Sequence, residues 1–145
     1  MKKIFLILLT MCLFLCGCDN TIYHWEFKKP VSEVQEISII YIDGYSSNEV
    51  INTQPIKIIE SSEYKNFYNE IQSLQMKKLF KMEFDTPNNY CFLIRYDNEH
   101  YCILSVLGSG YIEPYEDGTI LTLYWEKLDF NREDFENLIN KYLNS

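Results

Sequence analysis

The sequence lacks alanine altogether and has only five glycines and two histidines among its 145 residues. Five scattered glycines provide no glycine-rich loop that could hold a phosphate group. His24 and His100, together with the cysteines, lack the close paired spacings of zinc motifs. The two histidines are also the only side chains whose ordinary pKa lies near neutrality. We therefore expect no catalytic residues, no metal site and no cofactor.

The sequence also lacks an apolar run long enough to span a membrane. The longest run, residues 4–15, would rise only ~18 Å as a helix, whereas the hydrocarbon core of a bilayer is ~30 Å thick. It follows the positively charged pair Lys2 and Lys3. A positive start followed by a short apolar stretch is typical of a cleaved secretory signal, so we predict that residues 1–17 are a signal peptide.

The end of this run, Leu15, Cys16, Gly17 and Cys18, resembles the lipobox of bacterial lipoproteins. If Cys18 is the lipid acceptor, Gly17 is the small residue required just before the cut. If Cys16 were the acceptor, the large side chain of Leu15 would occupy that position. The resemblance implies that Cys18 becomes the first residue and carries acyl chains such as palmitate. Two or three chains hold a protein stably on a membrane, because each buried methylene contributes ~0.8 kcal/mol. An ordinary secretory signal is the alternative.

Basic residues are scarce. The formal net charge is −8, and removal of Lys2 and Lys3 leaves 11 basic and 21 acidic residues, a net charge of −10. Phosphates and anionic headgroups repel such a body, which argues against nucleic-acid binding and against attachment through a polybasic patch. The membrane contact is therefore expected through the acyl chains on Cys18.

Only Cys91 and Cys102 remain as thiols, both within residues 90–106, a predicted hairpin with its turn at 97–100. This turn places the two cysteines on one face but ~13 Å apart, beyond disulfide reach, and a turn centred on Asp97 and Asn98 brings them closer. We expect two packed free thiols, with a disulfide as the alternative. His100 and Cys102 would stand ~7 Å apart, too far for a catalytic hydrogen bond.

The rest of the chain predicts a lipidated N-terminus and tether over 18–35 and a single α+β domain over 36–145. The domain is expected to contain an antiparallel sheet of about five strands with two amphipathic helices packed on one face. The predicted strands are 36–42, 50–59, the two arms of the hairpin, 111–115 and 119–125. Pro55 makes the second of these an edge strand or divides it.

Two helices follow from apolar residues at helical spacing. In the first, Ser61 and Ser62 supply capping hydroxyls. Its buried face is predicted to be Tyr64, Phe67, Tyr68, Ile71 and Leu74. In the second, Asn131 caps the helix together with Asp134. Its buried face is predicted to be Phe135, Leu138, Ile139 and Tyr142.

The lipobox, the Ile-rich strand VQEISIIYI, the hairpin CFLIRYDNEHYCIL and the ending NREDFENLINKYL together resemble a diffuse group of small lipoproteins of low-GC Gram-positive bacteria. The resemblance implies an architecture and a location at the cell envelope. It implies no activity and no binding residue.

Aromatic residues are plentiful, and four of them, Tyr111, Tyr115, Tyr124 and Trp125, fall in the later strands. Rings exposed on a sheet face can stack on sugars or pack against a partner protein. We therefore expect a lipid-anchored, extracytoplasmic and non-catalytic module on the cell membrane that binds an envelope protein or a glycan. The alternatives are an immunity-like or inhibitor protein for a basic partner and a small envelope hydrolase.

Overall fold

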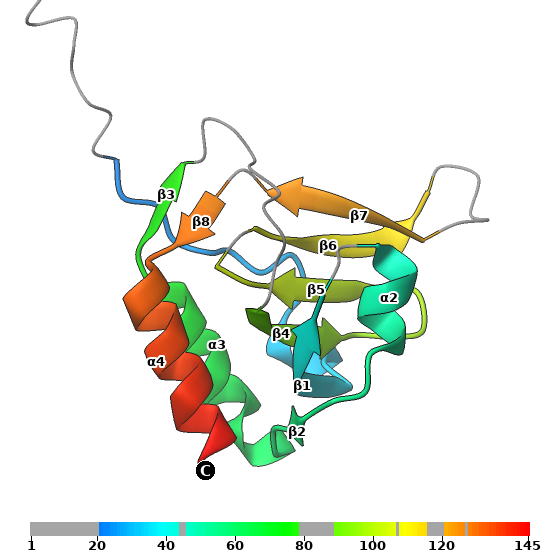
Figure 1. Cartoon of the computed structure of the whole chain (residues 1–145), viewed down its shortest axis with the longest axis horizontal. Helices are drawn as coiled ribbons and strands as arrows, with labels where there is room; N and C mark the ends of the chain where they lie inside the picture. Colours follow the sequence, from blue (N-terminus) through cyan, green and yellow to red (C-terminus); the bar gives the residue numbers. More distant parts are fainter. Residues whose placement is uncertain (1–20, 44–45, 79–88, 107, 116–120, 127) are drawn as a thin grey trace, which may run out of the picture.

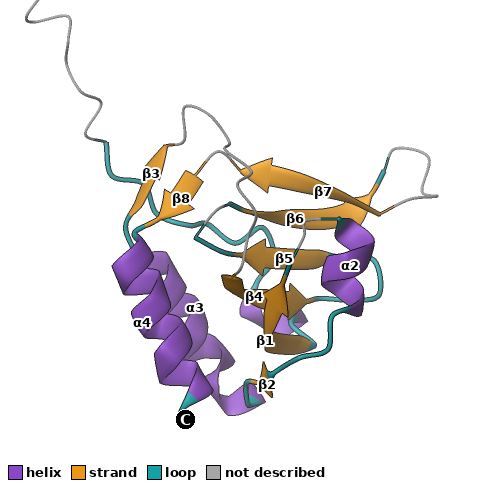
Figure 2. Ribbon diagram, viewed as in Figure 1, coloured by secondary structure: helices purple, strands orange, loops and turns teal. Residues whose placement is uncertain are grey.

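The computed structural model describes residues 21–43, 46–78, 89–106, 108–115, 121–126 and 128–145, and within these ranges the chain folds as the predicted α+β domain. A six-stranded antiparallel sheet has the strand order β2-β1-β4-β5-β6-β7, and a separate antiparallel pair joins β3 to β8 (Figures 1 and 2). The strands are β1 (Glu36–Ile42), β2 (Lys57–Ile58), β3 (Met76–Lys78), β4 (Asn89–Arg95), β5 (Tyr101–Leu104), β6 (Ser109–Pro114), β7 (Leu121–Glu126) and β8 (Leu128–Phe130).

The large sheet is buried on both faces, because its central strands carry apolar residues at consecutive positions. In β1, Ile37 and Ile39 face one core, whereas Ile40 and Ile42 face a second. Side chains alternate between the faces of a strand, so consecutive isoleucines supply both cores. Each face of the central strands therefore has an apolar core of its own.

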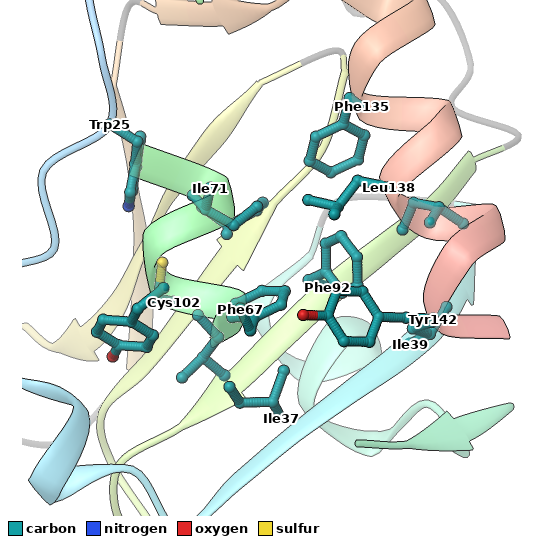
Figure 3. Close-up of a cluster of buried hydrophobic side chains, with 14 of the residues drawn as sticks. Trp25, Ile37, Ile39, Phe67, Ile71, Phe92, Cys102, Phe135, Leu138 and Tyr142 are labelled. Atoms are coloured by element: carbon teal, nitrogen blue, oxygen red, sulfur yellow. The ribbon is translucent and has the colours of Figure 1, made fainter. Parts of the chain in front are cut away.

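Two helices cover the first face, as predicted. α3 (Tyr64–Ser73) and α4 (Arg132–Leu143) each bury the predicted apolar face, with Leu74 partly buried just after α3. Figure 3 shows Phe67 and Ile71 of α3 meeting Phe92 of β4 and Phe135, Leu138 and Tyr142 of α4. Edge-to-face contacts join Phe92 to Phe67, Phe135 and Tyr142 at 4.8–6.1 Å between ring centroids.

The two helices begin differently. Asn131 caps α4, because its side chain accepts a hydrogen bond from the backbone N–H of Asp134, as predicted. In contrast, a 3₁₀ turn, η2 (Ser61–Glu63), precedes α3, and neither its N-cap nor that of α3 makes a side-chain capping hydrogen bond. The predicted capping role of Ser61 and Ser62 is therefore wrong.

The second face is covered in part by a helix that the sequence pattern did not predict. α2 (Ser47–Asn52) lies where a strand over 50–59 was expected, and only β2 remains of that strand, at the sheet edge after Pro55. A capping box explains the helix: Ser46 accepts from Glu49 N, and the Glu49 carboxylate accepts from Ser46 N. Val50 then packs on Ile40 and Ile42.

The N-terminal strap, residues 21–30, contradicts the expected tether over 18–35. Tyr23 and Met76 exchange two backbone hydrogen bonds of 3.1 and 2.8 Å. Trp25 is 2% exposed and belongs to the first core. In Figure 1 the strap is blue and runs from the β3–β8 pair across the large sheet to the 3₁₀ turn η1 (Val31–Glu33). The domain therefore begins before residue 36, because an indole in the core cannot belong to a tether.

Candidate functional site

The N-terminal strap closes the part of the first core that α3 and α4 leave uncovered. The Trp25 ring stacks on Tyr111 of β6 with 5.6 Å between centroids and packs on Phe130 of β8 at 6.2 Å. Phe27 stacks on Tyr68 of α3 at 3.8 Å. These contacts join the first described residues to a helix and to both sheets, so the strap is an integral layer of the domain.

A row of polar groups lies beneath the strap. The hydroxyls of Tyr68 and Tyr96 are 2.9 Å apart, and the Tyr111 hydroxyl donates to Glu26 O at 3.1 Å while accepting from Lys28 N at 3.0 Å. Burial raises the pKa of Tyr68 to about 12, and it also raises the pKa of Tyr96 and of Tyr111. The three phenols therefore stay neutral and act as hydrogen-bond partners.

Two lysines from the strap lie over these rings. Lys28 Nζ is 4.1 Å from the centroid of Tyr111, and Lys29 Nζ is 5.5 Å from that of Tyr96. Lys28 also pairs with Glu113 at 3.7 Å, and Lys29 with Asp97 at 3.6 Å. The ring faces attract the ammonium groups, so the lysines fasten the strap to β6 and to the turn after β4.

Neither Cys91 nor Cys102 forms a disulfide, and both are buried, as predicted, but the predicted geometry is wrong. Ile94 opposes Cys102 across β4 and β5, so Cys91 is three residues from the position opposite Cys102 and faces the other side of the sheet. Cys102 lies in the first core and Cys91 in the second. A disulfide is thus excluded by the sheet itself, because its sulfur atoms would lie on opposite faces.

Neither thiol is suited to act as a nucleophile. Burial raises the pKa of Cys91 to about 12 and raises that of the fully buried Cys102 well above its ordinary value, even though Lys28 and a hydrogen bond with Tyr111 act in the opposite direction. The thiolate is the reactive form of cysteine. Both thiols therefore stay protonated and pack within the two cores.

His100 serves the turn between β4 and β5. Its Nδ1 lies 2.8 Å from Asp97 Oδ1, which also accepts from the backbone N–H groups of Glu99 and His100. Burial of the Asp97 carboxylate would raise its pKa, but these hydrogen bonds prevail and lower it to about 2. His100 is thus hydrogen-bonded to Asp97 in its own turn, whereas Cys102 is hydrogen-bonded to Tyr111. The other histidine, His24, has its Nδ1 3.0 Å from Leu74 O.

Exposed cations lie at the end of the domain where the first residues of the strap meet β3. Lys77 and Lys78 of β3 are exposed, Arg132 opens α4, and Ile22 of the strap is 55% exposed. Ile22, Lys77 and Arg132 line one cavity of about 270 Å³ together with Asp129 of β8.

Asp129 is the unusual group of this cavity. It opposes Lys77 across β3 and β8, yet its Oδ1 atom is buried and has no hydrogen-bond partner within the part of the chain that the structure describes. Burial raises its pKa to about 6, although Arg132 and the backbone N–H of Phe130 lower it. A carboxylate held this way is destabilised in its charged form.

The structure buries one of the four residues of the predicted aromatic surface. Tyr111 is 3% exposed and belongs to the core, so its assignment to a binding surface is wrong. Tyr115 and Tyr124 are 50% and 40% exposed. Trp125 pairs with Gly110 in the sheet, and its side chain lies outside the described part of the structure. The expected group therefore contributes two exposed rings.

An exposed aromatic pair occurs elsewhere. Tyr41 of β1 and Tyr90 of β4 are cross-strand neighbours, and their exposed rings meet edge to face at 5.3 Å between centroids. Tyr41 lies close to the end of β1 and Tyr90 close to the start of β4, so the pair left a signal in the sequence. It could have been found only with the register of β1 against β4.

The lipobox residues Leu15, Cys16, Gly17 and Cys18 lie outside the described residues. Within the described ranges no helix has the length and apolar content to cross a membrane, and no three side chains of His, Cys, Asp or Glu gather as metal ligands. Comparison of the chain with protein-family models, curated proteins and solved structures finds no match.

Proposed function

We propose that this chain is a bacterial lipoprotein, anchored by acyl chains on Cys18 to the outer side of the cytoplasmic membrane, and that its domain is a non-catalytic binding module. The observation that carries the proposal is the start of the fold. Tyr23 already pairs with β3, and Trp25 is already in the core. The folded body thus begins within a few residues of the predicted cut before Cys18, which supports a leader that ends there.

The side chains available for chemistry support the non-catalytic part of the proposal. Burial raises the pKa of Cys91 and of Cys102, and His100 is held by Asp97 in a turn. A nucleophile needs an adjacent base or a lowered pKa. The small envelope hydrolase therefore lacks support from the described residues.

Exposed tyrosines support the binding part of the proposal. Tyr41 and Tyr90 form one exposed pair on β1 and β4, and Tyr124 on β7 is a further exposed ring. Tyrosine offers a large ring with a polar end, which suits both proteins and sugars as partners. The partner is thus an envelope protein or a glycan.

The inhibitor of a basic partner remains the second candidate, because the processed chain carries a net charge of −10. Charge complementarity of this kind accelerates association and weakens with salt. Capture of a basic envelope protein that disappears at high salt would favour this function over the binding of a neutral glycan.

The test of anchoring is metabolic labelling with radioactive palmitate in a bacterial host, followed by membrane fractionation. Wild type should incorporate label and sediment with membranes, and Cys18→Ser should do neither. Cys16→Ser is the matched control, since that cysteine would be removed with the leader, and it should be labelled as wild type is. Unlabelled wild type, or equal labelling of Cys18→Ser, would contradict the proposal.

A further inference from the structure

The connection between Cys18 and the folded body is short. Backbone hydrogen bonds fix Tyr23 to Met76 at 3.1 and 2.8 Å, so four residues, 19–22, separate this point from Cys18. At ~3.3–3.6 Å per residue, the fully extended chain from Cys18 to Tyr23 reaches about 17 Å. If acyl chains hold Cys18 at the membrane, as proposed above, Tyr23 must stay within that distance of it. The exposed side chains around this point, Ile22, Lys77, Lys78 and Arg132, are called the anchor-proximal end.

The side chains at this end suit an anionic lipid surface. No ion pair among the described residues involves Lys77 or Lys78, both of which are exposed, and Arg132 is exposed while pairing with Glu136 at 3.6 Å. Ile22 adds an exposed apolar side chain between the acyl site and β3. Basic side chains are attracted to anionic headgroups within about a Debye length, ~8–10 Å, and the short connection lets them come within that range.

Asp129 of β8 and Glu133 and Asp134 of α4 lie at this end too, but further acidic residues lie away from it. Glu60 and Glu63 flank η2, next to β2, and Asp97 and Glu99 lie in the turn between β4 and β5. Figure 1 shows β2 and that turn on sides of the domain remote from the β3–β8 pair. The body as a whole is acidic, so repulsion from the headgroups favours the orientation that keeps these groups away.

We propose that the anchor-proximal end (Ile22, Lys77, Lys78 and Arg132) rests on an anionic phospholipid bilayer and holds the domain in one orientation. The proposal depends on the lipid anchor and adds a second contact to it. A single attachment point leaves a domain free to tumble, whereas a second contact beside it fixes which face meets the membrane. The turn between β4 and β5 is then presented to partners in the envelope.

The test uses the acylated full protein, reconstituted in vesicles of phosphatidylglycerol and phosphatidylcholine that carry a nitroxide quencher on the headgroup. A fluorophore is placed on Lys78→Cys at the anchor-proximal end, or on Glu99→Cys or Glu60→Cys at remote positions; Cys91 and Cys102 are buried and stay unlabelled. We expect quenching at residue 78 to be several-fold stronger than at residues 60 and 99. Equal quenching at the three positions in protein that carries the acyl chains would overturn the proposal while leaving the anchor intact.

Two controls separate orientation from anchoring. With the probe on Arg132→Cys, the pair Lys77→Gln and Lys78→Gln should weaken quenching in phosphatidylglycerol vesicles, whereas Lys65→Gln on α3 should not. A flexible Gly-Ser insertion after Asn20 should reduce quenching at residue 78 without releasing the protein from the vesicle. Protein without acyl chains on Cys18 would overturn the proposed function itself, and crosslinking between copies through residue 78 in place of quenching would overturn the membrane contact.

Discussion

At the residue scale, Trp25 decides whether the first described residues are a tether or part of the domain. Its ring is 2% exposed and packs on Tyr111 and Phe130. Removal of a buried indole leaves a cavity, and such substitutions cost ~3–5 kcal/mol. We predict that Trp25→Ala lowers the free energy of unfolding by about that amount, measured by urea denaturation of the mature chain with Cys18→Ser.

The matched control for Trp25→Ala is Trp25→Phe. The indole Nε1 of Trp25 is buried and has no hydrogen-bond partner among the described residues, so phenylalanine keeps most of the stacking and removes an unsatisfied donor. We expect this variant to lose less than about 1.5 kcal/mol. If Trp25→Ala unfolds at the wild-type urea concentration, the strap is not part of the core.

Asp129 gives a second prediction at this scale. The pKa of Asp129 in the folded domain, about 6, lies above its ordinary value of 3.8, because burial disfavours the charged carboxylate. The folded protein therefore holds this proton more tightly than the unfolded chain does. The stability that Asp129 contributes is present in full below its unfolded pKa and is lost as the pH rises through about 6.

We predict that Asp129→Asn raises the free energy of unfolding at pH 7 by about 1 kcal/mol, since solvent around the half-buried carboxyl screens part of the effect. The difference between variant and wild type should vanish as the pH falls to about 4. Urea denaturation at a series of pH values measures it. A difference that is independent of pH would show that the Asp129 carboxyl is not perturbed.

At the element scale, the contrast between α2 and α3 tests how these helices start. Ser46 caps α2 through Glu49 N at 3.2 Å, whereas a 3₁₀ turn containing Ser61 leads into α3 without a side-chain cap. We predict that Ser46→Ala lowers the free energy of unfolding by about 1 kcal/mol. Ser61→Ala should stay within about 0.5 kcal/mol of wild type. Equal effects in thermal denaturation would contradict these assignments.

The elements also show what the sequence can and cannot predict. The strand 36–42 and the buried faces of α3 and α4 follow from apolar spacing alone, and the structure confirms them. α2 was missed because its cap, a serine and a glutamate three residues apart, is a local signal, while the surrounding isoleucines favour a strand. α2 ends at Asn52, ahead of Pro55, and its Val50 packs on the second face of the sheet.

The hairpin of β4 and β5 shows the limit set by register. Arg95 opposes Tyr101, which leaves a five-residue connection, whereas the sequence favoured a four-residue turn at 97–100. A shift of one residue reverses the face on which a side chain lies. For this reason the absence of a disulfide between Cys91 and Cys102 was correctly expected, but the two cysteines were wrongly placed on one face.

At the scale of the whole molecule, the sequence predicted the fold class but not the start of the domain. Within residues 21–30, Tyr23, Trp25 and Phe27 alternate with polar residues, yet they contact three different elements in turn and not one neighbouring strand. Such a segment acquires its structure only from tertiary contacts. Tyr111 was wrongly assigned to the aromatic surface for a related reason, since the strap that buries Tyr111 lies far from this residue in the sequence.

The whole account depends on acyl chains at one position in the chain. The most direct measurement is mass spectrometry of the protein purified from bacterial membranes, with sequencing of its first peptide. We predict a chain that begins at Cys18 and carries a diacylglyceryl group on that sulfur. A chain that retains residues 1–17, or one that begins near Cys18 with an unmodified thiol, would contradict the account.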